Sequence, residues 1–306
     1  MFINRDFNSI LELLQAFPNE QSCIDQLEAL RWGGFVVSPF DETSKVYKCK
    51  GNKYRCRNTG RYFNAKTGTL FDNTKISLQK WFVAIWLVTS HKKGISSMQL
   101  ARDIAVTQKT AWFMLHRIRK CFGIENDNDL DGNVEVDETY VGGKNKNRHN
   151  SKKVENAQGR STKDKAPVVG MIERGGKLNA RMVDNAQAKT LSREVLCNVK
   201  ETATLHTDEW MGYSGLAKIY DHLVVNHGHS EYVNGAAHTN TIEGFWSLLK
   251  RGIIGIYHFT SKKYLQNYID EFVFRYNTRT YTEAGRFNLL LANTETRTKY
   301  ADLIRC

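Results

Sequence analysis

The 306-residue sequence has few prolines, no long apolar run and no cysteine framework. With three prolines and a hydrophobic content of 41%, it has ample material for folded cores. The longest apolar run, residues 81–88, is too short to span a membrane and predicts a buried helix. The amino terminus shows no signal-peptide pattern, and the six scattered cysteines do not resemble a secreted disulfide framework, so we expect a cytoplasmic protein.

Positive charge is what the sequence has in excess. Its 44 Lys and Arg residues outnumber its 32 Asp and Glu residues, which gives a formal net charge of +12 and an isoelectric point near 9.3. This excess predicts a polyanionic partner, although a basic surface can also serve solubility alone. At this length we expect more than one domain, such as a catalytic domain preceded by a nucleic-acid-binding region.

Asp137 is the first of three acidic residues that stand in well-defined local patterns. It lies in the valine-rich run 133–141, which predicts a strand that ends at the pair Gly142-Gly143. Strict alternation places Asp137 and Glu135 on one face of this strand and Glu138 on the other face.

The other two acidic residues are Asp208 and Glu243. Asp208 closes the short apolar strand predicted over 202–208, at the carboxyl end where open α/β sheets place ligand sites. Glu243 belongs to the segment 240–251, whose apolar residues recur at helical spacing. Lys250 follows Glu243 on the same face, two helical turns further along.

Each acidic residue also has an ordinary explanation. A lone Asp at a strand end is usually a turn or cap residue, and a lone Glu on an amphipathic helix is usually solvated. Together, three carboxylates suit two divalent cations, because magnesium prefers such oxygen ligands. Two such ions roughly 3.5 to 4 Å apart can clamp a phosphodiester between them.

Three motifs resemble the catalytic signature of DDE transposases of bacterial insertion sequences. They are VEVDETYVGG at 134–143, LHTD at 205–208 and HTNTIEGFWSLLKR at 238–251. Within that group they are most similar to the ISXO-type branch, which is related to the eukaryotic Merlin elements. The resemblance extends from about Cys23 to Tyr281, and its motifs are long.

The resemblance implies an α/β fold with a ribonuclease H-like catalytic domain, whose first and fourth strands lie side by side and bring Asp137 and Asp208 together. It implies that these residues and Glu243 bind two Mg²⁺ or Mn²⁺ ions, and that Lys250 steadies a phosphate or a terminal base. Asn240, one turn before Glu243, competes for the third position, since some members of this branch use an asparagine there. We expect Glu243, because it is a charged oxygen donor.

Residues 1–75 are expected to form a degenerate zinc-ribbon-like module. The family builds this region on two Cys-x-x-Cys knuckles, but here Cys23 is matched by Gln26 and Cys56 by Thr59, while Cys49 lies off the pattern. A structural zinc site needs four sulfur or imidazole ligands, so we do not expect structural zinc. The small β fold would then depend on the packing of four aromatic residues, Tyr47, Tyr54, Tyr62 and Phe63.

Residues 76–125 match a helix-turn-helix pattern. Helices are predicted over 77–90, 96–104 and 107–120, with Ser96 or Ser97 and then Thr107 as amino-terminal caps of the last two. In such a pair, the exposed start of the second helix meets base edges in the major groove. The expected base contacts are Gln108, Lys109 and Thr110. The expected phosphate contacts are Arg117, Arg119 and Lys120. The alternative is an ordinary helical hairpin with a basic solvated face.

The catalytic domain is expected over 130–306, with a basic insertion at 142–165 and carboxyl-terminal helices. The insertion has eight Lys or Arg residues and two acidic ones, and it either binds DNA phosphates beside the metal site or is a solvated loop. The insertion residues assigned to DNA are Lys144, Lys146, Arg148, Lys152 and Lys153. The other predicted strands are 168–172, 178–183 and 222–225, and the predicted helices are 188–199, 212–220, 241–250 and 261–276.

The function implied by the resemblance is DNA transposition. The protein would bind the terminal inverted repeats of its element in double-stranded DNA, hydrolyse a strand to free a 3′ hydroxyl, and join that hydroxyl to target DNA. We expect a homodimer or larger assembly, associated with the nucleoid and without a membrane partner. Two alternatives are a domesticated helix-turn-helix regulator without catalysis and a ribonuclease H-like nuclease. The intact trio argues against the regulator, because buried like charges repel one another without a metal.

Overall fold

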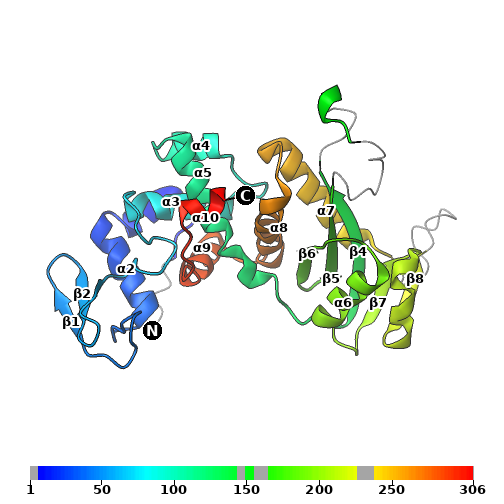
Figure 1. The fold of residues 1–306 in the computed structure, drawn as a ribbon, viewed down its shortest axis with the longest axis horizontal. Helices are drawn as coiled ribbons and strands as arrows, with labels where there is room; N and C mark the ends of the chain where they lie inside the picture. Colours follow the sequence, from blue (N-terminus) through cyan, green and yellow to red (C-terminus); the bar gives the residue numbers. More distant parts are fainter. Residues whose placement is uncertain (1–5, 143–148, 155–164, 226–237, 306) are drawn as a thin grey trace. The chain divides into compact units, whose positions relative to one another are not determined.

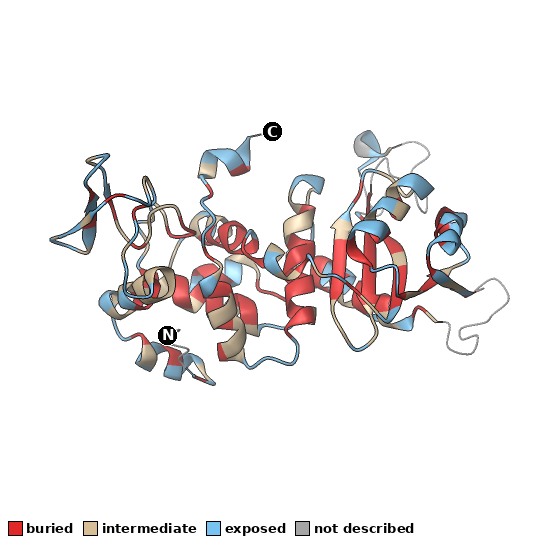
Figure 2. Cartoon of the chain, turned by 90° about the horizontal axis from the view of Figure 1, so that it is seen from below, coloured by how far each residue is buried: buried red, intermediate tan, exposed pale blue. Residues whose placement is uncertain are grey.

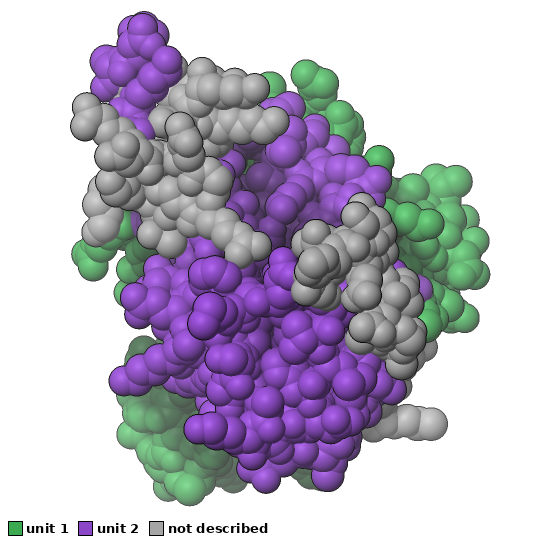
Figure 3. Space-filling view, turned by 90° about the vertical axis from the view of Figure 1, so that its right-hand side faces the viewer, with its two compact units in different colours: residues 1–121, 280–306 green, residues 122–279 purple. Residues whose placement is uncertain are grey.

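The structure is a computed structural model that describes residues 6–142, 149–154, 165–225 and 238–305. Its internal contacts divide the chain into two compact units, drawn in two colours in Figure 3. The first consists of residues 1–121 and 280–306, and the second of residues 122–279. Within the described ranges, no helix combines the length and the apolar character needed to cross a bilayer.

The second unit is built on a five-stranded mixed sheet with the order β6-β5-β4-β7-β8 (Figure 1). Strand β4 pairs antiparallel with β5 and parallel with β7, where Val134 lies opposite Leu205. The expected adjacency of the strands that carry Asp137 and Asp208 is therefore confirmed. The strands are β4 (Asn133–Val141), β5 (Ala166–Glu173), β6 (Leu178–Met182), β7 (Thr204–Asp208) and β8 (Asp221–Val225).

Helices cover both faces of this sheet, because its central strands carry apolar residues on both sides. The central strands are accordingly buried (Figure 2). In β5, Val168 and Ile172 join the core under α7 and α8, whereas Val169 and Met171 join the core under α6. The α-helices of this unit are α6 (Ala188–Asn198), α7 (Asn240–Gly252) and α8 (Lys262–Asn277). Its shorter helices are η1 (Phe122–Glu125), η3 (Asn150–Lys152), η4 (Met211–Lys218) and the π-helical turn Ile253–Tyr257. The segment predicted as a helix over 212–220 is thus a 3-10 helix rather than an α-helix.

The first unit combines a helical core with a small sheet. Its helices are α1 (Ile10–Ala16), α2 (Glu20–Trp32), α3 (Leu78–Ser90), α4 (Ser97–Asp103), α5 (Gln108–Arg119), α9 (Glu283–Ala292) and α10 (Tyr300–Ile304). Phe287 of α9 packs against Phe82 of α3, with ring centroids 5.6 Å apart. This packing explains why residues 280–306 group with the amino-terminal residues. From the sequence we had expected them to belong to the catalytic domain, with residues 130–279.

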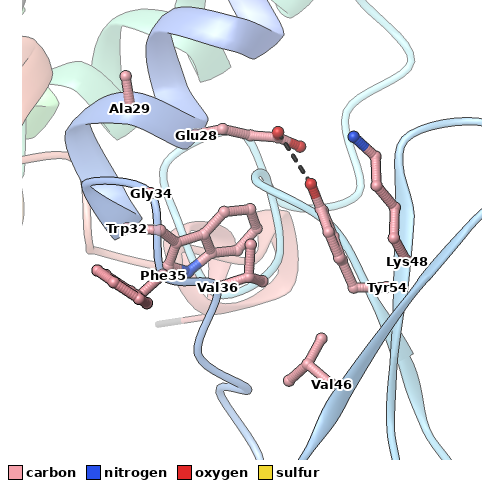
Figure 4. A pocket seen from close by; sticks show the side chains of 9 residues that line it. All are labelled: Glu28, Ala29, Trp32, Gly34, Phe35, Val36, Val46, Lys48 and Tyr54. Carbon is pink, nitrogen blue, oxygen red and sulfur yellow. Dashed lines mark hydrogen bonds between the residues drawn. The ribbon is translucent and has the colours of Figure 1, made fainter.

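The small sheet is antiparallel and consists of β1 (Val46–Cys49), β2 (Lys53–Cys56) and β3 (Tyr62–Phe63). One face packs on α2, where the Tyr54 ring lies 5.1 Å from that of Trp32 and its hydroxyl donates a hydrogen bond to Glu28 (Figure 4). Tyr54 and Phe63 are buried there, as predicted. Tyr47 and Tyr62 are exposed, which corrects the expectation that all four rings pack together. Alternation along the strands turns these two rings to the other face.

The match of Cys23 and Gln26 to the broken first knuckle of a zinc ribbon was wrong. Cys23 and Gln26 are buried on α2, so neither residue lies in a ribbon turn. Cys56 does end β2, and it is fully buried. The hydroxyl groups of Ser38, Ser44 and Thr59 lie near its sulfur and can stabilise the thiolate by hydrogen bonding. Burial raises the pKa of the Cys56 thiol, but these hydrogen bonds outweigh burial and lower the pKa to about 6.

Candidate functional site

One pocket in the second unit gathers the three predicted acidic residues. It has a volume of about 520 Å³, and Asp137, Asp208 and Glu243 all line it. Asp137 comes from the middle of β4, Asp208 from the carboxyl end of β7, and Glu243 from the first turn of α7. Lys250, near the end of α7, lines the same pocket. Asn240 is the first residue of α7 and is not among the residues that line it.

Asp137 lies in surroundings that oppose its negative charge. Burial raises the pKa of its carboxyl to about 7, and the neighbouring charges of Glu138 and Asp208 act in the same direction. Hydrogen bonds from the Trp246 indole nitrogen at 2.9 Å and from the Glu138 backbone at 2.8 Å only partly oppose this rise. A carboxyl group destabilised by burial and by like charge is a place where a cation would be strongly attracted.

Lys250 contributes a positive charge to the pocket. Desolvation lowers the pKa of its ammonium group, while the attraction of Asp137 raises it. An ammonium group in such surroundings can bind a phosphate oxygen as a compact point charge.

The donor chemistry of the pocket fits magnesium or manganese, since carboxylate oxygens are the ligands that these ions prefer. The carboxylates are nevertheless turned toward local donors: Asp208 accepts from the Trp210 backbone at 3.1 Å, and Glu243 accepts from the Thr239 hydroxyl at 3.4 Å. In this arrangement, no three His, Cys, Asp or Glu side chains of the described ranges are close enough to hold a metal ion. Side-chain rotation would be needed for them to share one.

Glu135 has a role that the sequence did not reveal. Its side chain is fully buried, and its carboxylate accepts hydrogen bonds from the backbone nitrogens of Thr241 and Ile242, at 2.8 and 3.0 Å. It also forms an ion pair with Arg174 at 2.8 Å, and the ring nitrogen of His238 lies 3.1 Å away. A carboxylate at the first turn of a helix satisfies free backbone donors and complements the helix dipole. Glu135 therefore fastens the helix that carries Glu243 to the strand that carries Asp137.

Trp246 and Gly170 set how closely α7 approaches the sheet. The indole ring lies over Gly170 of β5, where an added Cβ atom would come within 2.6 Å of the ring. The same indole nitrogen donates to Asp137. A glycine inside a predicted strand is a sequence signal for such a close approach, but the sequence does not say what approaches.

Glu138 is a further acidic residue of the pocket that the sequence did not single out. It is buried, and it accepts a hydrogen bond of 2.8 Å from the Tyr213 hydroxyl. Burial and the charge of Glu138 raise the pKa of Tyr213 well above its usual value, so Tyr213 remains a donor. The predicted alternation is confirmed here, because Tyr213 belongs to the core on the α6 face of the sheet.

Comparison with known proteins identifies the family of the chain. Residues 129–277, which include Asp137, Asp208 and Glu243, match the ISXO2-like transposase domain. An uncharacterized protein in transposable element ISH50 of Halobacterium salinarum is 31% identical over 253 residues, which cover 78% of this chain and 84% of that protein. The chain belongs to the ISXO2-like transposase family. A chain of a pre-cleavage Mos1 transpososome is similar with a TM-score of 0.24 and 12% identity, over 71% of this chain and 80% of that one, which is too weak to support an argument.

In this ISXO2-like transposase, the predicted base-contacting residues lie at the start of α5. Ser96 and Thr107 cap α4 and α5, as the sequence predicted. Gln108 and Lys109 are exposed, and Thr110 is half-buried. Lys109 also places its ammonium group 5.2 Å from the ring centroid of Tyr300 in α10.

Two predicted phosphate contacts of the transposase were wrong. Arg117 is only 4% exposed and Arg119 only 1%, so neither guanidinium is presented to a ligand. Arg117 donates a hydrogen bond of 3.0 Å to the Asp72 carbonyl and lies over the Trp81 ring. Lys120 is exposed, and its assignment stays a prediction.

The basic insertion is only partly described. Lys144, Lys146 and Arg148 lie outside the described residues, as does the side chain of Lys152. Lys153 is exposed and follows the short helix η3. The assignment of this insertion to DNA therefore stays a prediction.

Proposed function

We propose that this transposase cleaves the ends of its own insertion sequence by metal-dependent hydrolysis and joins the freed 3′ hydroxyl to target DNA. The observation that carries the proposal is the gathering of Asp137, Asp208 and Glu243 in one pocket with Lys250. The order of the mixed sheet, with parallel neighbours β4 and β7, supports a ribonuclease H-like catalytic domain.

The three carboxylates would hold two Mg²⁺ or Mn²⁺ ions, which when bound would supply positive charge for the attacking and leaving oxygens of a phosphodiester. The residues of the chain would prepare this site. Asp137 is oriented by Trp246, and its pKa of about 7, raised by burial, means that it is fully ionised only above neutral pH when no metal is bound. Glu135 would hold α7 in place, and Lys250 would bind a phosphate oxygen of the DNA strand.

The position of Glu243 supports it as the third acidic ligand. Its side chain lines the pocket, whereas Asn240 is not among the lining residues. We therefore propose the set Asp137, Asp208 and Glu243.

Recognition of the element ends would belong to the first unit. The capped pair α4 and α5 supports a helix-turn-helix role, with Gln108, Lys109 and Thr110 at the base edges and Lys120 at a phosphate. We propose double-stranded DNA as the partner and a homodimer or larger assembly that brings two ends together in the nucleoid.

The test is strand cleavage by Asp137→Asn and Asp208→Asn on a labelled duplex that carries an element end. Each variant should lose about a thousandfold or more in magnesium-dependent rate, because a metal ligand is removed. Duplex binding in EDTA, measured by gel shift, should be unchanged. Glu209→Gln is the matched control, because Glu209 is exposed and follows Asp208 directly.

Cleavage at the wild-type rate by either variant would overturn the site assignment. A wild-type protein that binds the ends but never cuts them would instead support the regulator. Cutting of an RNA–DNA hybrid in preference to the element end would support a ribonuclease.

A further inference from the structure

The small sheet carries a row of aromatic and cationic side chains on the face opposite α2. In the antiparallel register, Tyr47 of β1 lies opposite Arg55 of β2, and Arg55 lies opposite Tyr62 of β3. Residues directly opposite one another project from the same side of a sheet. These three side chains therefore form one row across all three strands.

The two aromatic rings of this row are available to a ligand. Tyr47 is 43% exposed and Tyr62 is 59% exposed. The Arg55 guanidinium lies 5.9 Å from the centroid of the Tyr62 ring, within the range of a cation–π contact. The row thus offers flat apolar surfaces on both sides of a planar cation.

Positive charge surrounds the row. The Lys45 ammonium lies 5.7 Å from the Tyr47 ring centroid, and Lys53 occupies the next position on the same face of β2. The sequence has no acidic residue between Glu42 and Asp72. The basic residues of that stretch are Lys45, Lys48, Lys50, Lys53, Arg55, Arg57, Arg61 and Lys66. Such a surface is complementary to a polyanion.

The opposite face of the same sheet has a different character. It is occupied by packing against α2, and it borders a pocket of about 580 Å³ whose lining includes the carboxylate of Glu28 (Figure 4). Tyr54, on that face, is buried and uses its hydroxyl for Glu28. The exposed rings of Tyr47 and Tyr62 are therefore not needed for the core of the sheet.

We propose that the row Tyr47–Arg55–Tyr62 binds an unpaired strand of DNA. Bases would stack on the two tyrosine rings, while Arg55, Lys45 and Lys53 would bind the phosphates. Stacking of this kind requires unpaired bases, because the bases of a duplex are already stacked on one another. This role is separate from cleavage at the carboxylate pocket and from duplex recognition by α5.

The test is the affinity for a short fluorescent thymidine oligonucleotide, measured by anisotropy in EDTA, where cleavage has no influence. The double variant Tyr47→Ala/Tyr62→Ala should bind about tenfold more weakly for each ring lost, with little change for a duplex. The variant Tyr47→Phe/Tyr62→Phe should keep its affinity, because it keeps both rings. Tyr281→Ala is the matched control, since Tyr281 is also 44% exposed and lies in the same unit.

The proposal fails if the wild-type protein does not bind the oligonucleotide, or if the alanine variant binds it equally well. It also fails if single-stranded and duplex affinity fall together, because the row would then contact phosphates only. Should the alanine variant not fold, Arg55→Gln decides: it should weaken single-strand binding and reduce the salt dependence by about one ion. Unchanged affinity and salt dependence would overturn the proposal.

Discussion

The two sheets of this transposase place charge in opposite ways. In the five-stranded sheet, acidic residues of β4 are withdrawn from solvent: Glu135 and Glu138 are buried, and Asp137 is half-buried. In the three-stranded sheet, Arg55 and Lys53 remain exposed beside aromatic rings. Burial makes the carboxylates attract a small cation strongly, because they have lost their hydration. Exposure leaves the basic residues free to meet a large polyanion, whose binding does not require a closed pocket.

Within β4, two neighbouring acidic residues of one face show how differently burial can be compensated. Glu135 forms an ion pair with Arg174 and accepts two backbone hydrogen bonds from the start of α7. Its negative charge is therefore compensated by donors of the protein. Burial raises the pKa of Asp137, and the charges of Glu138 and Asp208 add to this rise. The first arrangement serves the architecture of the pocket, and the second leaves attraction for a ligand.

The largest of these effects is on the cleavage rate, where a residue that lines the pocket is compared with a neighbour on α7 that does not. Glu243→Ala should lower the cleavage rate by about a hundredfold or more, because it removes an oxygen donor from the pocket. Asn240→Ala should change the rate by no more than a few-fold. Initial rates of strand cleavage at an element end measure both. The reverse outcome would assign the third ligand to Asn240.

A smaller effect, on the free energy of unfolding, is expected when the buried negative charge of Glu135 is removed. Glu135→Gln should lower the free energy of unfolding by about 2 to 3 kcal/mol, because Arg174 and the start of α7 lose a buried anionic acceptor. Urea denaturation measures this loss. Glu201→Gln, at an exposed position of the same unit, should stay within about 0.5 kcal/mol of the wild type. Equal stability of the two variants would show that Glu135 does not fasten α7.

The smallest effect concerns the carboxyl of Asp137, whose two hydrogen bonds only partly offset its burial. Its folded pKa of about 7 lies above the ordinary value of 3.8, so the folded state binds this proton more tightly than the unfolded state does. The ionised carboxylate therefore lowers the free energy of unfolding. This destabilisation is complete above pH 7, shrinks as the pH falls and vanishes below about pH 4. In EDTA, Asp137→Asn should therefore stabilise the protein by about 1 to 2 kcal/mol at pH 8 and by much less at pH 5. Thermal unfolding at the two pH values measures the difference, and a gain that does not depend on pH would contradict the assignment.

Local patterns predicted the elements of the site well. Alternation over 133–141 predicted strand β4 and the faces of Asp137 and Glu138, and apolar periodicity predicted α7 around Glu243. These features depend on neighbours in sequence. Hydrogen bonds from Thr241 to Glu135 join residues 106 positions apart, and a local sequence pattern cannot predict such a pair.

The errors also have physical reasons. Arg117 and Arg119 were assigned to DNA phosphates because they lie further along the predicted recognition helix, but here α5 buries them within its own unit. The long stem of arginine and its flat charged head allow such burial beside aromatic rings and carbonyl groups. Cys23 was matched to a broken ribbon knuckle by resemblance to the family, although the segment around it forms a capped helix.

The fastening of α7 by Glu135 has a consequence for the order in which the protein is synthesised. Asp137 and Asp208 leave the ribosome before the helix that carries Glu243, and contacts between segments so distant in sequence form late. A chain interrupted before Asn240 has two of the three carboxylates but lacks the helix that completes their pocket. A chain that stops there therefore lacks the residue proposed as the third metal ligand.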